Sequence, residues 1–240
     1  MSSSHCFENP PTLNPNYGAG TVQELGGLKT YVTGPPDSKL AILLVCDAFG
    51  YETPNLRKLA DKVAAAAGFL VVVPDFLYGD PADVNNPQFD RHVWLKNHDT
   101  TEGCKDAKAV IAGLKSRGIS SIGAAGFCWG GMVVVKLASC NDIQAAVILH
   151  PGLITADEIN AVKVPTAILG AEKDKICPPE QLKQLGELLA VKSEIESYVK
   201  IFPGVAHGWT LRYSDEDDSA VKIAEEAHSD LLNWFTTHVK

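Results

Sequence analysis

Residues 120–131 read SSIGAAGFCWGG, and this stretch decides the fold. Its small and apolar residues predict a buried strand, and its glycines predict a tight turn. The apolar residues after this stretch predict a helix. Side chains two positions before and after Cys128 would collide in such a turn, which explains Gly126 and Gly130. The turn places the Cys128 sulfur at a helix N-terminus, where the helix dipole favours a thiolate. We therefore predict a nucleophilic cysteine; the alternative is a glycine-rich turn around a buried, inert one.

Strands and helices alternate on both sides of this turn. Residues 40–46 form a nearly continuous apolar run, which is typical of a strand buried on both faces of a mostly parallel sheet. We expect strands at 28–33, 40–46, 69–73, 120–125, 143–149, 164–169 and 197–202, and helices at 54–67, 101–117, about 129–139, from 178 through 189, and about 218–238. This order predicts the α/β class, with a mostly parallel, doubly wound sheet flanked by helices.

The predicted sheet belongs to a single domain, residues 28–240. Residues 1–27 are rich in Ser, Pro, Asn and Gly, and we interpret them as an irregular N-terminal arm. Residues 74–98 read as a long connection with at most one short helix. Long connections in compact domains are often functional, so this segment is a candidate neighbour of the site.

Charge and cysteine content exclude several classes of function. The net charge is −8 and no run of Lys or Arg occurs, so we expect neither nucleic acid nor a membrane surface as a partner. The apolar runs are far shorter than a bilayer-spanning helix. The six cysteines form no C-x-x-C pair or disulfide-like spacing, and residues 1–11 do not resemble a secretory signal; both features favour the cytoplasm. No metal or nucleotide motif occurs, so no cofactor is expected, and the oligomeric state stays open.

The chain downstream of Cys128 supplies two partners for a catalytic triad. In folds built on such a turn, the nucleophile is followed in sequence by an acid and then by a histidine, each after a strand. Asp174 follows the strand VPTAILG, and His207 follows the strand SYVKIFP. Because the carboxyl ends of parallel strands meet at one edge, we predict a triad of Cys128, Asp174 and His207. Glu172 competes with Asp174 for the role of the acid. The alternative for Asp174 is an ordinary loop carboxylate, and the alternative for His207 is a histidine on a surface loop.

The other histidines fit a catalytic role less well. His228 and His238 fall in the last predicted helix as packing or surface residues. His150 follows a strand and could line the site, but His-Pro-Gly is more typical of a turn. The histidines that precede the nucleophile, against the expected order, are His5, His92 and His98.

These residues together resemble the dienelactone hydrolase (carboxymethylenebutenolidase) family of the α/β-hydrolase superfamily. The resemblance rests on G-F-C-W-G-G at 126–131, C-D-A-F-G at 46–50, the strand and loop around Asp174, and P-G-V-A-H-G at 203–208. A cysteine in this turn is a fairly specific mark of the family. The resemblance implies an α/β-hydrolase fold and hydrolysis of a small ester or lactone through a thioester acyl-enzyme.

The same resemblance implies roles for residues around the nucleophile. Asp47 matches the position of an acid that holds the resting thiol, where the family usually has the longer Glu. The N–H of Ala48 would complete an oxyanion hole with the N–H of Trp129, which the turn already places beside the sulfur. The family also uses arginines to grip a substrate carboxylate, and Arg212 and Arg91 are the candidate matches.

Aromatic residues are further candidates for substrate contact, with core packing as the alternative reading. The predicted substrate-binding aromatics are Phe49, Tyr78 and Trp209, and Tyr51, Phe76 and Trp129 complete the possible lining.

Sequence alone leaves rival functions open. A non-catalytic small-molecule receptor could keep the same residues, and thioester hydrolysis is a near variant. A glycan hydrolase using Asp47 and Asp174 as paired carboxylates is a further alternative, although it leaves Cys128 without a role. An activated thiol also predicts that Cys128 is sensitive to peroxide, with Cys46 and Cys177 as possible neighbours.

Overall fold

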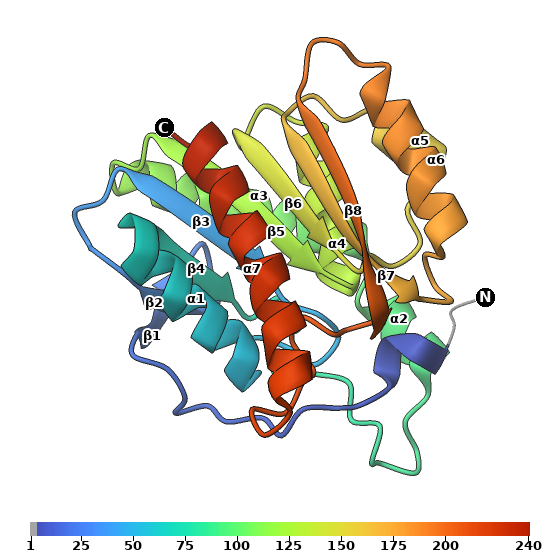
Figure 1. Cartoon of the computed structure of the whole chain (residues 1–240). Helices are drawn as coiled ribbons and strands as arrows, with labels where there is room; N and C mark the ends of the chain where they lie inside the picture. The colour runs from blue at the N-terminus through green and yellow to red at the C-terminus, as the bar shows by residue number, and fades with distance from the viewer. Residues whose placement is uncertain (1–3) are drawn as a thin grey trace.

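Eight strands form one mixed sheet in the computed structural model, which describes residues 4–240 (Figure 1). The strands are β1 (Thr21–Leu25), β2 (Leu28–Thr33), β3 (Leu40–Val45), β4 (Leu70–Pro74), β5 (Ser121–Phe127), β6 (Ala145–Leu149), β7 (Thr166–Lys173) and β8 (Ser197–Ala206). Their order across the sheet is β1-β2-β4-β3-β5-β6-β7-β8. β2 pairs antiparallel with β1 and with β4, and every other neighbouring pair is parallel. The prediction of a mostly parallel α/β sheet is confirmed.

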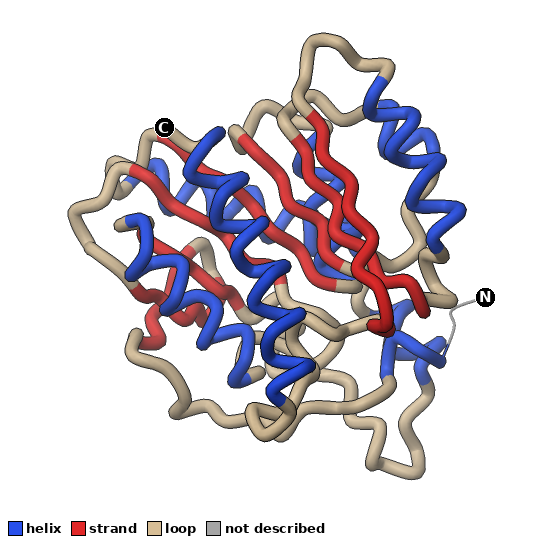
Figure 2. The backbone as a smooth tube through the Cα atoms, viewed as in Figure 1, coloured by secondary structure: helices blue, strands red, loops and turns tan. Residues whose placement is uncertain are grey.

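Helices cover both faces of this sheet (Figure 2). α1 (Pro54–Ala67) and α7 (Asp218–His238) pack on one face. α3 (Thr100–Ser116) and α4 (Trp129–Ala138) pack on the other, together with α5 (Ala156–Asn160) and α6 (Pro179–Ala190). The short η1 (Ser4–Phe7) and α2 (Arg91–Asn97) lie beyond one edge of the strands (Figure 1). Among residues 4–240, no helix has the length and apolar character that crossing a membrane requires.

The central strands form where the sequence is continuously apolar. Every residue of β4, β5 and β6 is buried, as is every residue of β3 after Leu40. This burial is expected of parallel strands that helices cover on both faces. α1 begins with Pro54, whose ring suits the first turn, and ends at Gly68, where a φ of 69° favours glycine.

Two regions differ from the prediction. Thr21–Leu25 form β1 inside the predicted irregular arm; four of its five residues are exposed, so apolar patterning gives no signal there. β7 and β8 both extend beyond their predicted ends, to Lys173 and Ala206, with a register shift between Ala171 and Lys173. The extension carries both strands directly to the candidate catalytic residues.

The carboxyl ends of the parallel strands position the candidate site. Cys128, Asp174 and His207 are the residues that immediately follow β5, β7 and β8. Strand pairing aligns these ends: Phe127 of β5 pairs with Leu149 of β6, and Lys173 of β7 pairs with Ala206 of β8. Three side chains that are far apart in sequence therefore meet at one edge of the sheet, where ligands bind in open α/β folds.

Candidate active site

Cys128 occupies a strained turn between β5 and α4. Its backbone has φ 51° and ψ −108°, a region that non-glycine residues rarely adopt. Its N–H donates to the carbonyl of Leu149 (3.1 Å), and its carbonyl accepts from the N–H groups of Gly131 (3.0 Å) and Gly152 (3.1 Å). Strain of this kind costs about 1–3 kcal/mol and persists only where the surroundings enforce it, which is typical of active sites.

The glycines that flank Cys128 have no room for a side chain. A Cβ on Gly126 would lie 2.1 Å from the carbonyl oxygen of Gly130. A Cβ on Gly130 would lie 2.2 Å from the carbonyl oxygen of Val45 in β3. The turn thus brings α4 against the backbone of the sheet, as the G-x-C-x-G spacing predicts.

Gly126→Ala should lower the free energy of unfolding by about 3 kcal/mol or more, because the clash is with backbone that the turn holds in place. Gly131→Ala is the matched control in the same turn. Its Cβ would lie 3.2 Å from a side-chain atom of Ile148 and 3.3 Å from Pro151 Cα, far looser than at Gly126, and alanine is the better helix former, so we expect a change below about 1 kcal/mol. Urea unfolding measures both; equal stabilities would contradict the packing argument.

His207 and Asp174 form a buried hydrogen-bonded pair. His207 Nδ1 lies 2.7 Å from Asp174 Oδ2. Asp174 Oδ1 accepts from the N–H groups of Ile176 (2.8 Å) and Cys177 (3.3 Å), which orient the carboxylate. Burial lowers the pKa of His207, but the charge of Cys128 and the bond to Asp174 outweigh it and raise this pKa to about 9. Because Nδ1 is bonded to Asp174, Nε2 is the nitrogen left to act on the thiol.

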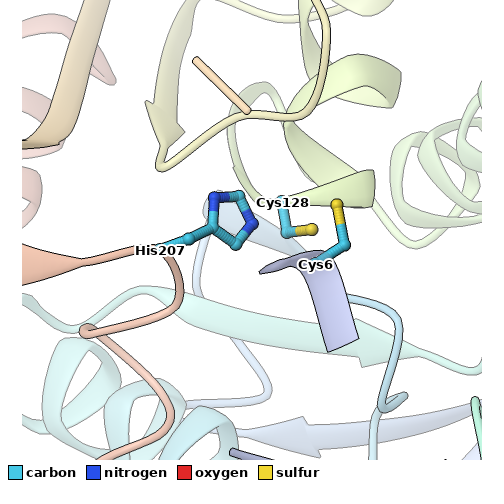
Figure 3. Close-up of side chains that lie close together, drawn as sticks. All are labelled: Cys6, Cys128 and His207. Atoms are coloured by element: carbon cyan, nitrogen blue, oxygen red, sulfur yellow. The ribbon is translucent and has the colours of Figure 1, made fainter. Parts of the chain in front are cut away.

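Cys6 covers the nucleophile. One ring nitrogen of His207 and the Sγ atoms of Cys6 and Cys128 all lie within 4.8 Å of one another (Figure 3). Cys128 is only 1% exposed beneath η1, and Phe7 anchors η1 by packing edge-on against Trp94, with ring centroids 5.8 Å apart. The hydrogen bond to Cys6 and burial raise the pKa of the Cys128 thiol well above its usual value, against the opposing effect of His207. The contact with Cys6 therefore disfavours ionisation of the thiol.

Asp47 and Arg212 form a buried ion pair. Asp47 Oδ2 lies 2.8 Å from both Nε and Nη2 of Arg212, and Asp47 Oδ1 accepts from the N–H of Phe49 (2.9 Å). Arg212 also donates from Nη1 to the carbonyl of Glu8 (3.1 Å), and its guanidinium lies 4.7 Å from the centroid of the Phe49 ring. Among residues 4–240, Asp47 makes no hydrogen bond to Cys128. The expected thiol-holding contact of Asp47 is therefore replaced by a bond to Arg212, and Arg212 is already paired.

The remaining predicted site residues are Glu172 and the two oxyanion donors, Ala48 and Trp129. Glu172, the competitor of Asp174, is exposed and accepts from the N–H of Gly204 (2.7 Å). Ala48 follows β3, and Trp129 is the first residue of α4. Neither of their N–H groups donates a hydrogen bond to another residue within the described chain, 4–240. Their role as an oxyanion hole stays a prediction.

Two hollows of about 250 Å³ each lie beside the covered nucleophile. The lining of the first includes His207, Trp209 and Arg212. The lining of the second includes Phe76, Tyr78 and Trp129. Arg91 begins α2, with Nε 3.4 Å from Nε2 of His92, and no hydrogen bond or ion pair joins it to the triad within residues 4–240. The predicted pocket residues are thus divided between hollows: Phe49 and Tyr51 line a third one, of about 170 Å³, and Arg91 lies apart from all three.

Comparison with known proteins assigns the family. The sequence model of the dienelactone hydrolase family matches residues 28–239. The chain belongs to this family. It is 32% identical over 227 residues to the carboxymethylenebutenolidase homolog of Mus musculus, a match covering 92% of each chain. It is also 39% identical over 198 residues to a Zea mays protein named endo-1,3;1,4-beta-D-glucanase, covering 80% of this chain and 64% of the maize protein. This chain therefore spans less than two thirds of that relative.

Solved structures agree with this assignment at the level of the fold. The chain is similar to the crystal structure of a candidate dienelactone hydrolase from Klebsiella pneumoniae, with a TM-score of 0.73 and 20% sequence identity. The match covers 88% of this chain and 93% of the other. The predicted α/β-hydrolase fold and the predicted family are both confirmed, and the chain is a hydrolase of the dienelactone hydrolase family.

Sequence reasoning missed Cys6 and undervalued His150. The His150 ring centroid lies 5.1 Å from that of His207, and His150 Nε2 lies 2.7 Å from Thr210 Oγ1. Burial keeps the pKa of His150 well below its usual value, so its ring supports His207 as a neutral group. The sequence signal for a place in the site was the position of His150 directly after the strand β6. Cys6 carries no such signal, because it lies in a segment without strand or helix patterning.

Proposed function

We propose that this chain hydrolyses small esters or lactones with Cys128 as nucleophile, His207 as general base and Asp174 as the residue that orients His207. One observation carries the proposal: His207 is hydrogen-bonded to Asp174, and a ring nitrogen of His207 lies within 4.8 Å of Cys128 Sγ at the N-terminus of α4. Membership of the dienelactone hydrolase family supports hydrolysis. The thiol chemistry follows from the side chains that meet there.

The reaction needs only groups that the site contains. His207 Nε2 takes the Cys128 proton as the sulfur attacks the carbonyl carbon. The N–H groups of Trp129 and Ala48 stabilise the oxyanion; losing one such donor costs about 3–4 kcal/mol in comparable sites. The carbon–oxygen bond then breaks, the leaving alkoxide takes the proton from His207, and a thioester remains on Cys128. Water, deprotonated by His207, attacks the thioester, which releases the carboxylic acid and restores the thiol.

Substrates should be small and activated. A thiol nucleophile suits lactones, enol esters and thioesters, whose leaving groups depart readily. Cys128 is almost completely buried, so η1 must move away from the sulfur before a substrate reaches it. The neighbouring hollows of about 250 Å³ fit small molecules rather than polymers.

The direct test is to trap the acyl-enzyme. Protein quenched with acid during turnover of p-nitrophenyl acetate should gain one acetyl group, which peptide mapping should locate on Cys128 and hydroxylamine should remove. A panel of lactones that includes cis-dienelactone then ranks the substrates. Turnover with the acetyl group on another residue would overturn the assignment of the nucleophile. Failure to turn over any member of the panel would favour a receptor.

A glycan hydrolase, as the name of the maize relative invites, is less well supported. Such an enzyme needs one carboxyl group as general acid and a second as base or nucleophile. Asp174 is bonded to His207 and to two backbone N–H groups, while Asp47 is bonded to Arg212. Both carboxylates thus already have protein partners, and a mechanism based on them would leave Cys128 without a role.

A further inference from the structure

Three potential metal ligands converge at the candidate active site from distant parts of the chain. Cys6 comes from η1, Cys128 from the turn before α4, and His207 from the residue after β8. The two Sγ atoms and the His207 nitrogen lie within 4.8 Å of one another, and Figure 3 shows the Cys128 sulfur between the His207 ring and Cys6. The residues are too far apart in sequence to form a recognisable metal motif.

The chemistry of this trio fits Zn²⁺. Two thiolates and one imidazole are a ligand set that Zn²⁺ favours, and three protein ligands leave a fourth tetrahedral position open. Bond lengths of about 2.0–2.3 Å place tetrahedral ligand atoms roughly 3.5–3.8 Å apart. The observed atoms, all within 4.8 Å, need to close by no more than about 1.3 Å. Because η1 is a single short turn outside the sheet, Cys6 can make this adjustment more easily than Cys128 or His207, which directly follow strands.

The surroundings of His207 independently favour a metal. Nδ1 is bonded to Asp174 at 2.7 Å, which is the carboxylate–histidine arrangement that orients zinc ligands. The Nε2 atom is buried, and within the described residues 4–240 it has no hydrogen bond that meets ordinary distance and angle limits. Once His207 Nε2 loses its proton, it is therefore free to bind an ion that the two sulfurs also bind.

We propose that Cys6, Cys128 and His207 bind one Zn²⁺ ion and that this ion inhibits the hydrolase. Binding forms two Zn–S bonds and one Zn–N bond, and it releases to solvent the protons held by the two thiols and by His207 Nε2. It removes the nucleophile and the base together, and it fixes η1 over the site through Cys6. The inhibition rests on the proposed function, whereas the binding of zinc does not.

The test is a metal titration of the reduced, chelator-treated, untagged full chain. Wild type should bind one Zn²⁺ per chain, and Co²⁺ should give a thiolate-to-metal charge-transfer band. Cys6→Ser should weaken Zn²⁺ binding at least about tenfold and reduce this band, since one ligand is lost. Cys140→Ser is the matched control: Cys140 is also a half-buried free cysteine, outside the trio, and its replacement should change neither readout.

Activity provides the second readout. Zn²⁺ should inhibit ester hydrolysis by wild type reversibly, with recovery on addition of EDTA, and Cys6→Ser should raise the inhibitory concentration at least about tenfold. Equal Zn²⁺ affinity in wild type and Cys6→Ser would overturn the three-ligand site, even if the active-site pair alone bound metal. If no ester were hydrolysed, the titration would still decide the zinc site, so the two proposals fail separately.

Discussion

Cys128→Ala should lower kcat for p-nitrophenyl acetate hydrolysis on the order of 10⁵- to 10⁶-fold, as removal of a triad nucleophile does in other enzymes. The residual rate would come from the oxyanion donors and from His207 acting directly on water. Cys128→Ser should retain more activity than the Ala variant, because a hydroxyl can still attack with help from His207. Initial rates of the three proteins, with the acyl adduct quantified in each, measure the effect.

Folding must be separated from chemistry in this comparison. Cys128 has a φ of 51°, so replacing it keeps the backbone strain, and thermal unfolding of each variant checks that the turn survives. Cys140→Ala, which changes a free cysteine at the far end of α4, should leave kcat within about twofold of wild type. If Cys128→Ala retained wild-type kcat, the thiol mechanism would be wrong, whatever the family.

The resting arrangement of the thiol differs from what the family resemblance implies. An acid was expected beside Cys128, but Asp47 is paired with Arg212, and Cys6 is the group that contacts the sulfur. The hydrogen bond between the sulfurs raises the pKa of Cys128 and lowers that of Cys6, so it opposes ionisation of the nucleophile. Movement of η1 would remove this partner and open the site, which couples access of the substrate to activation of the thiol.

Much of this architecture was predictable because it depends on local patterns. The buried strands β3 to β6 are continuously apolar, and each candidate triad residue directly follows a strand. The parallel order of the sheet then brings Cys128, Asp174 and His207 to one edge without any further information. Gly126 and Gly130 reveal the tight turn because only glycine fits there.

The parts that were not predictable depend on long-range packing of polar segments. β1 exposes most of its side chains, so its pairing with β2 has no apolar signature. The position of Cys6 depends on Phe7 packing against Trp94, a contact between two irregular regions. Asp47 and Arg212 are 165 positions apart in the sequence. No local sequence pattern indicates that the Asp47 carboxylate pairs with Arg212 rather than with Cys128.

Asp174→Asn should lower kcat roughly 10³- to 10⁴-fold with little change in KM. Asp174 Oδ1 accepts from the N–H groups of Ile176 and Cys177, and Oδ2 is bonded to His207 Nδ1. In the variant, the amide oxygen should keep the two backbone donors, which turns the NH₂ group towards Nδ1. Nδ1 must then accept a hydrogen bond, so the ring proton moves to Nε2. In that tautomer His207 cannot take the proton of Cys128.

The same substitution should change how stability depends on pH. Burial lowers the pKa of His207, but Cys128 and Asp174 raise it to about 9, above the unfolded value of about 6.5. A raised pKa contributes stability that is complete below about pH 6.5 and is lost as the pH rises through about 9. Wild type should therefore lose more stability over this interval than Asp174→Asn, as urea unfolding at about pH 6 and about pH 9.5 would measure. Glu172→Gln replaces an exposed acid near the end of β7 and should match wild type both in kcat and in its loss of stability over this pH interval. A kcat for Asp174→Asn within tenfold of wild type would exclude Asp174 as the orienting acid.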